Sequence, residues 1–176
     1  MWDHLEPKEK TRCSPLEDMA QHALRVAQVC DLLEALADDL PRRPVPVWRE
    51  AAHMCNDVVR RHYKLLLDVL LPMLEDRTRG NGECDPVLLR LQSDFEEEAS
   101  GLYELNALMV DAVNDRSGNI GAEALGYALR CFFGALRRNV SWEMEVLLPL
   151  ATRRLNIADL NKLSRLMQAD PLTRAS

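Results

Sequence analysis

The fold is decided by the stretch VVRRHYKLLLDVLLPML, residues 58–74. Apolar residues recur in it at steps of three and four, the spacing that places side chains on one face of an α-helix. His62 interrupts this apolar face, and Pro72 follows one to two turns before the expected end of the helix. A similar stretch recurs late in the chain, where EVLLPLA (residues 145–151) echoes DVLLPML (residues 68–74). The sequence therefore predicts two helices of closely related pattern.

The echo also pairs the polar residues of the two copies. When Pro149 is aligned with Pro72, His62 corresponds to Asn139 and Leu66 corresponds to Glu143. Residues at i and i+4 lie on one face of a helix, so each copy presents two neighbouring side chains to the same side. The first copy keeps a histidine and the second keeps an acid. A duplicated helix pair and convergent packing both explain this relation.

Helix boundaries follow from caps and prolines on either side of these copies. Ser14-Pro15 with Glu17 has the pattern of a capping box, and Asp85-Pro86 starts a helix in a similar way. No segment alternates apolar and polar residues with a period of two, so strands are not expected. The predicted helices cover roughly residues 15–40, 46–75, 85–114 and 121–154, and a short last helix begins at Asn156 or Asp159 and ends near residue 168.

Long helices joined by short loops predict an all-α fold, an up-down-up-down four-helix bundle with a short C-terminal fifth helix. We expect residues 15–176 to form a single domain and residues 1–14 to form a flexible N-terminal arm. The chain is long enough for one domain with a substantial core.

Composition excludes several classes of protein. The chain has 176 residues, of which 47% are hydrophobic, and a net charge of −6. A disordered chain would be less apolar, and a nucleic-acid-binding protein would usually be basic. The apolar runs are too short to span a membrane, and the acidic start lacks an apolar signal core. We expect a cytoplasmic protein with an unknown protein partner, for which a homodimer is one candidate assembly, and no nucleic-acid or membrane partner.

Steps of three and four define the apolar seam of each helix. The seam predicted for the second helix consists of Trp48, Ala52, Cys55, Val59, His62, Leu66, Val69 and Met73. The seam predicted for the fourth helix consists of Leu125, Leu129, Phe132, Leu136, Asn139, Glu143, Val146 and Leu150.

Polar residues interrupt these seams at five positions: His22, His62, Glu98, Asn139 and Glu143. At about 1.5 Å of rise per residue, antiparallel packing brings all five to a similar height in the middle of the bundle. Buried polar groups need partners, because an unpartnered one costs about 1–3 kcal/mol. Imidazole and carboxylate groups could together bind a first-row transition metal. Equally, the side chains could bond to one another in a buried cluster that fixes the helix register.

The pattern resembles the hemerythrin-like HHE domains, four-helix bundles that hold a non-haem di-iron centre. In that family a His-x-x-x-Glu motif precedes a proline in a leucine-rich run, and His62, Leu66 and Pro72 stand at these places here. Asn139 and Glu143, with the proline run of residues 145–151, stand at the corresponding places of the fourth helix. The resemblance covers roughly residues 15–168 and follows the order of all four helices.

The resemblance implies metal ligands at His22, His62 and Glu143, with Asn139 and Glu98 as auxiliary candidates. The family's other ligand places carry Leu66, Phe95 and Asn139, which are lost ligand positions. We therefore expect a degraded iron site that binds at most one weakly held divalent transition metal, or none. The implied roles are sensing of oxygen, iron or nitric oxide, or a stress response.

A metal-free bundle that acts as a regulatory or protein-interaction module is the alternative. No catalytic residue is identified, so an enzyme is not expected.

Overall fold

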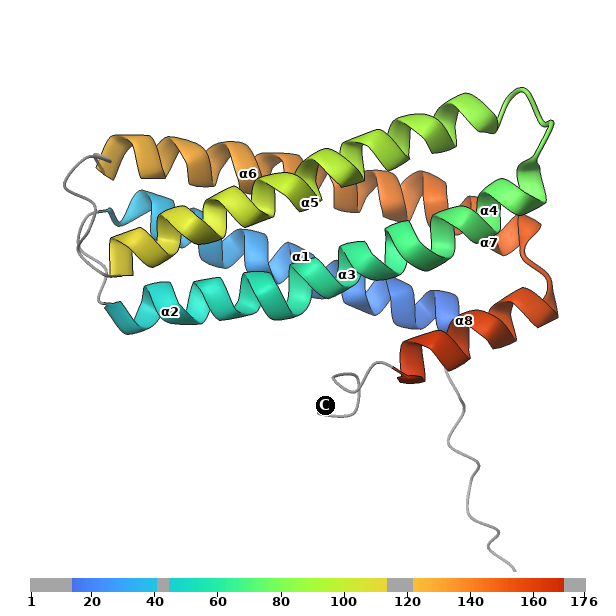
Figure 1. Ribbon diagram of the computed structural model, residues 1–176, viewed down its shortest axis with the longest axis horizontal. Coiled ribbons are helices and arrows are strands. Elements are labelled where there is room, and N and C mark those ends of the chain that lie inside the picture. Colours follow the sequence, from blue (N-terminus) through green and yellow to red (C-terminus); the bar gives the residue numbers. More distant parts are fainter. Residues whose placement is uncertain (1–13, 41–44, 114–121, 170–176) are drawn as a thin grey trace, which may run out of the picture.

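The computed structural model describes residues 14–40, 45–113 and 122–169, and these residues are helical apart from short turns, with no strand among them. Figure 1 labels the helices in chain order. Their bounds are α1 Pro15–Asp38, α2 Val45–Met54, η1 Cys55–Val59, α3 Arg60–Leu65, η2 Leu66–Leu70, α4 Leu71–Thr78, α5 Asp85–Val113, α6 Ala122–Trp142, η3 Glu143–Leu147, α7 Leu148–Arg154 and α8 Ile157–Ala169, where η marks a π-helical segment. The prediction of an all-α chain is confirmed.

Several of these elements follow one another without a break and form long rods. The elements from α2 to α4 make one rod over residues 45–78, and those from α6 to α7 make another over residues 122–154. In the interior of the molecule α1 packs against α6, α5 packs against α6, and α2 packs against α5. The long rods lie lengthwise side by side in Figure 1, and α8 covers one end of α1.

The helix starts follow the caps that the sequence predicts. Pro15 is the first residue of α1, and the backbone N–H of Ser14 donates a 2.8 Å hydrogen bond to Oε2 of Glu17. This bond satisfies one of the backbone donors that a helix start leaves free. The predicted arm of residues 1–14, apart from Ser14, lies outside the described residues, as do residues 41–44 and 114–121 between predicted helices.

Pro72 and Pro149 lie inside their rods, each as the second residue of a new α-helix. Proline has no N–H, and in an α-helix its ring collides with the carbonyl group four residues earlier. In both rods a π-helical segment directly precedes the proline. The N–H of Leu71 reaches back to the carbonyl of Leu66, and that of Leu148 reaches back to Glu143. The wider turn accommodates the proline, so the rod continues to Thr78 in one case and Arg154 in the other.

The π-helical segments η2 and η3 correspond to each other in the alignment that pairs Pro72 with Pro149, and both of their ends coincide. Each inserts one extra residue into a turn and shifts the buried face by one position. The predicted seam residues Val69 and Val146 are therefore only partly buried, and Leu70 and Leu147 are fully buried in their place. The duplicated pattern thus extends from the sequence to the backbone.

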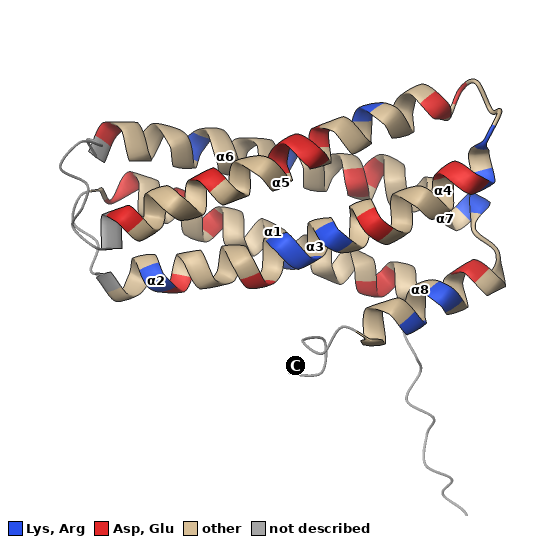
Figure 2. Cartoon of the chain, viewed as in Figure 1, with Lys and Arg blue, Asp and Glu red and all other residues tan. Residues whose placement is uncertain are grey.

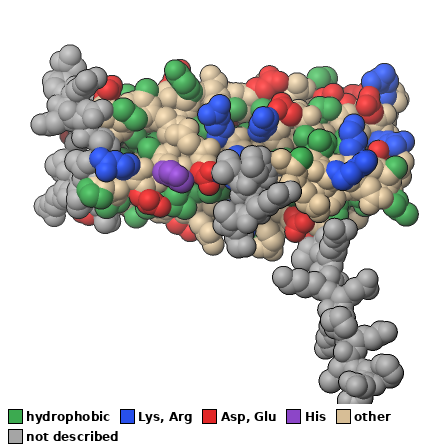
Figure 3. Space-filling model, turned by 60° about the horizontal axis from the view of Figure 1, so that its bottom comes forward, with side chains coloured by type: hydrophobic (Ala, Val, Ile, Leu, Met, Phe, Trp, Pro, Cys, Tyr) green, Lys and Arg blue, Asp and Glu red, His purple; other side chains and the backbone are tan. Residues whose placement is uncertain are grey.

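The surface carries a mixture of residue types. In the face shown in Figure 3, the Lys and Arg side chains lie in separate patches between acidic and apolar ones. Nowhere in the described part of the chain is a helix long and apolar enough to cross a membrane.

Candidate functional site

The two rods that carry the echoed stretches meet at a buried polar contact. Nε2 of His62, on α3, lies 2.6 Å from Oε2 of Glu143, the first residue of η3. The side chains of His62 and Glu143 are only 2% and 1% exposed. This contact is a hydrogen bond whose direction depends on the tautomer of the ring. Two of the three predicted metal ligands are therefore adjacent in the core.

A second polar pair lies beside the first. Asn139 of α6 is buried, and its Nδ2 donates a 3.4 Å hydrogen bond to the hydroxyl oxygen of Tyr63 on α3. The Tyr63 ring follows His62 in the chain and packs at a tilt against Phe95, with 5.9 Å between the ring centres. Burial raises the pKa of Tyr63 above its usual value, so the hydroxyl keeps its proton. We call His62, Tyr63, Asn139 and Glu143 the polar layer.

The polar layer retains groups that its own hydrogen bonds do not satisfy. Nδ1 of His62, Oδ1 of Asn139 and Oε1 of Glu143 are buried, and each lacks a hydrogen-bond partner among the residues that the structure describes. Leaving such a group unpartnered costs about 1–3 kcal/mol, and a water molecule or an ion commonly satisfies it. Three of the four residues of the layer therefore each have a polar atom that can still form a hydrogen bond.

His22, the third predicted ligand, stands at the edge of the layer. It is half-buried on α1, and within the described residues no hydrogen bond joins it to His62 or Glu143. Burial lowers the pKa of His22, and the neighbouring charges of His62 and Arg25 lower it further. A lowered pKa favours the neutral form of His22, the form that a metal requires.

Glu98, an auxiliary candidate in the sequence, lies on α5 and lines a surface groove with Leu105 and Phe132. Burial raises its pKa to about 7, and the charge of Arg138 partly opposes this shift. In the described residues no hydrogen bond connects Glu98 with His62 or Glu143. Its carboxylate thus belongs to the groove rather than to the hydrogen-bonded layer.

The positions that the resemblance marks as lost ligands hold packed side chains. Leu66 and Phe95 are both 0% exposed, and they belong to the continuous hydrophobic core. The alkyl chain of Leu66 cannot bind a metal, and the Phe95 ring fills volume beside Tyr63. These residues do not fit a di-iron pair.

Across residues 14–40, 45–113 and 122–169, no group of three or more His, Cys, Asp or Glu side chains is arranged to hold a metal ion. A ligand histidine also normally donates its second ring N–H to an acceptor, and Nδ1 of His62 has none. The residues present are therefore a poor fit for a preformed metal centre. What remains is a two-residue contact, His62 with Glu143, and a neutral histidine nearby.

Tyr63 and the π-helical segments were missed by sequence reasoning. Tyr63 is 3% exposed, and its hydroxyl oxygen accepts the hydrogen bond from the Asn139 amide. The position of Tyr63 next to His62 was the available signal in the sequence. The internal prolines were the available signal for η2 and η3, because a helix that continues through a proline must locally change its hydrogen bonding.

Comparisons with protein-family models, with curated proteins and with solved structures find nothing that matches this chain.

Proposed function

We propose that this chain is a hemerythrin-like, up-down-up-down four-helix bundle with a short fifth helix and a degraded metal site that binds at most a single metal ion, weakly. The packing of α1 on α6, α6 on α5 and α5 on α2 supports the proposed arrangement. The observation that carries the proposal is the buried contact of His62 with Glu143, two residues at the family's ligand places. The unpartnered Oε1 of Glu143 and Oδ1 of Asn139 support it further.

His62, Glu143 and His22 are the residues that would hold the ion. Imidazole nitrogen and carboxylate oxygen together suit iron and the neighbouring divalent metals. Because Leu66 and Phe95 exclude a second ion, reversible oxygen binding by an iron pair is not part of the proposal. The proposed roles are therefore sensing of oxygen, iron or nitric oxide, or a stress response, without catalysis.

Metal content and thermal unfolding test this proposal. An ion that binds only the folded state must stabilise it, so Fe(II), Mn(II) or Zn(II), added without oxygen, should raise the unfolding midpoint by several degrees. The Glu143→Gln variant should lose the rise, whereas Glu50→Gln, on the exposed surface of α2, should keep it. An unchanged midpoint, together with less than about 0.1 metal per purified chain, would rule the proposal out.

A metal-free regulatory or protein-interaction module is the second candidate. The specific observation in its favour is that His62 and Glu143 already satisfy each other at 2.6 Å, in a core that Leu66 and Phe95 fill. In a metal-free module, the role of the polar layer would be to fix the register of the two rods, that is, which of their residues face each other. A chelator would then leave the unfolding midpoint unchanged, and activity would depend on a surface.

A reducing compartment such as the cytoplasm is proposed for either candidate. Cys30, Cys55, Cys84 and Cys131 are all free thiols in the structure, which is usual where glutathione keeps cysteines reduced. A homodimer is also proposed, and light scattering after size exclusion would test it.

A further inference from the structure

The outer seam between α5 and α6 is hollowed at two separate places. Near the start of α5 lies a hollow of ≈ 330 Å³, lined by Pro86, Val87 and Leu91 of α5 and by Arg138 and Trp142 of α6. Further along lies a hollow of ≈ 280 Å³, whose lining residues include Glu97, Glu98, Gly101, Glu104 and Leu108 of α5 and Cys131 and Phe132 of α6. We call the two hollows together the α5–α6 groove.

The two hollows lie on one face. Val87, Asp94, Gly101 and Leu108 recur at a heptad spacing, so they form a single stripe along α5. From Pro86 to Leu108 this stripe is about 33 Å long, about the length of a six-turn helix. Gly101 lines the second hollow without a side chain. The two hollows together therefore extend along α5 for a length that another helix could follow.

The end near Trp142 is apolar. Trp142 is 46% exposed and Val87 is 38% exposed, and both border the same hollow. Single exposed apolar residues are common on soluble proteins, but neighbours that line one hollow indicate an anchoring site. Arg90 and Asp94 pair with each other at 2.9 Å on its rim, so Arg138 carries the remaining charge of this hollow.

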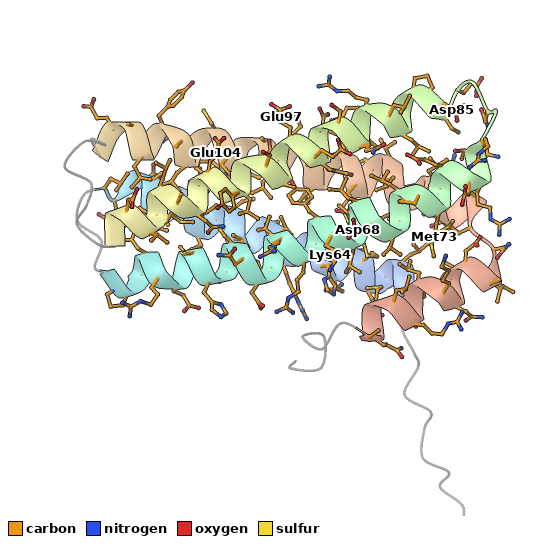
Figure 4. All side chains as sticks on the ribbon, viewed as in Figure 1. Lys64, Asp68, Met73, Asp85, Glu97 and Glu104 are labelled. Atoms are coloured by element: carbon orange, nitrogen blue, oxygen red, sulfur yellow. The ribbon has the colours of Figure 1, made fainter. Side chains whose placement is uncertain are left out.

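The other half of the groove is acidic. Glu97 and Glu104 project from the same side of α5 (Figure 4), and the middle of α5 is the acidic band in Figure 2. Neither carboxylate has a hydrogen bond or an ion pair with another residue in the described part of the chain. Arg138 is the cation whose charge acts on Glu98. Unpaired carboxylates around an apolar floor complement a basic partner.

We propose that the α5–α6 groove binds an amphipathic helix of a partner protein, with apolar residues against Trp142 and Val87 and lysine or arginine side chains against Glu97 and Glu104. A second copy of this chain using the same groove would bring like charges together, which is unfavourable. The α5–α6 groove would be the binding surface of the protein-interaction module proposed above. It does not depend on metal binding by His62, Glu143 and His22, because none of these residues lines the groove.

The test uses the full chain and two fluorescent helical peptides, each long enough for six turns. Both carry leucines along one face of the first three turns, and the last three turns carry lysines in one peptide and glutamates in the other. Fluorescence anisotropy measures affinity. We expect the lysine peptide to bind at least tenfold more tightly than the glutamate peptide, with an affinity that falls as salt is added.

Matched variants locate the binding. The double variant Glu97→Gln with Glu104→Gln should lower the affinity for the lysine peptide by about fivefold. Trp142→Ala should lower that affinity by about tenfold. The control is Glu50→Gln with Asp68→Asn, which removes the same charge from the exposed α2 and η2, and should leave affinity unchanged. Circular dichroism checks that each variant is folded.

Thiol labelling provides a second readout. Cys131 is exposed within the groove, whereas Cys84 is half-exposed in the turn before α5. Bound lysine peptide should slow the labelling of Cys131 and leave that of Cys84 unchanged. Equal affinity for both peptides, equal weakening by the control variant, or an unprotected Cys131 would each overturn the proposal.

Discussion

The stretches around Pro72 and Pro149 have nearly the same backbone but contribute different chemistry to the core. Both pass from an α-helix through a π-helical segment into a second α-helix that contains the proline, and these transitions coincide when the two prolines are aligned. At the paired positions, however, the first stretch presents His62 and Leu66 and the second presents Asn139 and Glu143. The backbone repeats because both prolines impose the same hydrogen-bond problem, while the side chains are free to differ.

This difference leaves one strong polar contact where a symmetric pair of stretches could make two. The first position of one copy, His62, bonds to the second position of the other, Glu143. The reciprocal pair is Leu66 and Asn139, which cannot bond because leucine has no polar group, and Asn139 turns to Tyr63 instead. The contrast teaches that two stretches with the same backbone can present different polar groups, so that Glu143 pairs with His62 across the rods while Asn139 bonds to Tyr63.

The largest effect is expected when the second stretch is made like the first. Glu143→Leu places leucine at both equivalent positions and leaves the ring nitrogen of His62 without its partner. Breaking a buried polar pair from one side is strongly unfavourable, so the free energy of unfolding should fall by about 3 kcal/mol. Urea unfolding followed by circular dichroism measures this loss.

The double variant His62→Leu with Glu143→Leu is the matched control. Removing both partners leaves no unsatisfied group of this pair, and the double variant should recover at least half of the stability that Glu143→Leu loses. A double variant that loses the sum of the two single losses would contradict the view that the contact matters as a pair.

A smaller effect is expected for the second hydrogen bond of the polar layer. Asn139→Ala leaves the Tyr63 hydroxyl without its donor and opens a small cavity, so stability should fall by about 1–2 kcal/mol. Tyr63→Phe removes only the hydroxyl and should lose less than Asn139→Ala does. A reversed order in thermal or urea unfolding would show that Tyr63 has another, stronger partner.

Glu98 provides a contrast with Glu143, because it is a half-buried carboxylate with no hydrogen-bonded partner in the described residues. Its pKa is raised from the ordinary 4.5 to about 7 in the folded chain. The folded state therefore binds more protons than the unfolded state between these values. The stability that this contributes is complete below pH 4.5 and is lost as the pH rises through 7.

Glu98→Gln should remove this dependence of stability on pH. The variant should be more stable than the parent at pH 8 by on the order of 1 kcal/mol, after allowance for solvent screening of a half-exposed group. The gain should disappear near pH 4.5, and unfolding curves at several pH values measure it. An equal gain at both ends of the range would mean that Glu98 does not titrate in this window.

The smallest effect concerns the two prolines themselves. Pro72→Ala and Pro149→Ala act on the same backbone arrangement, so their effects on stability should agree within about 0.5 kcal/mol. Thermal unfolding of the two variants, compared with the parent, checks this. A large difference would show that one π-helical segment is held by packing around it and the other by its proline.

Much of the fold could be predicted from the sequence, because helix starts and apolar faces are local properties. Pro15 and Asp85 begin helices as expected, and the last helix ends within a residue of its predicted end. The predicted seam was wrong at Val69, Val146 and Leu150, because the period of three and four assumes a regular α-helix throughout. The extra residue of a π-turn moves every later side chain around the axis.

The candidate site was predicted in part. His62, Asn139 and Glu143 were placed at one height from residue counts, and all three are buried there. Glu98 was placed at the same height, yet it lines the α5–α6 groove, since residue counts give position along a helix more reliably than direction around it. Tyr63 was not considered, because an aromatic residue beside a seam histidine is usually part of the core.

The sequence by itself determined that the chain is helical, where its helices begin, and that its two proline-containing stretches are related. Each of these follows from residues close together in the chain. Only the tertiary structure decided that His62 and Glu143 bond to each other across two rods, that Asn139 turns to Tyr63, and that the outer seam of α5 and α6 is open. Such contacts depend on how separate helices rotate against one another, and that rotation is set by the packing of the whole core.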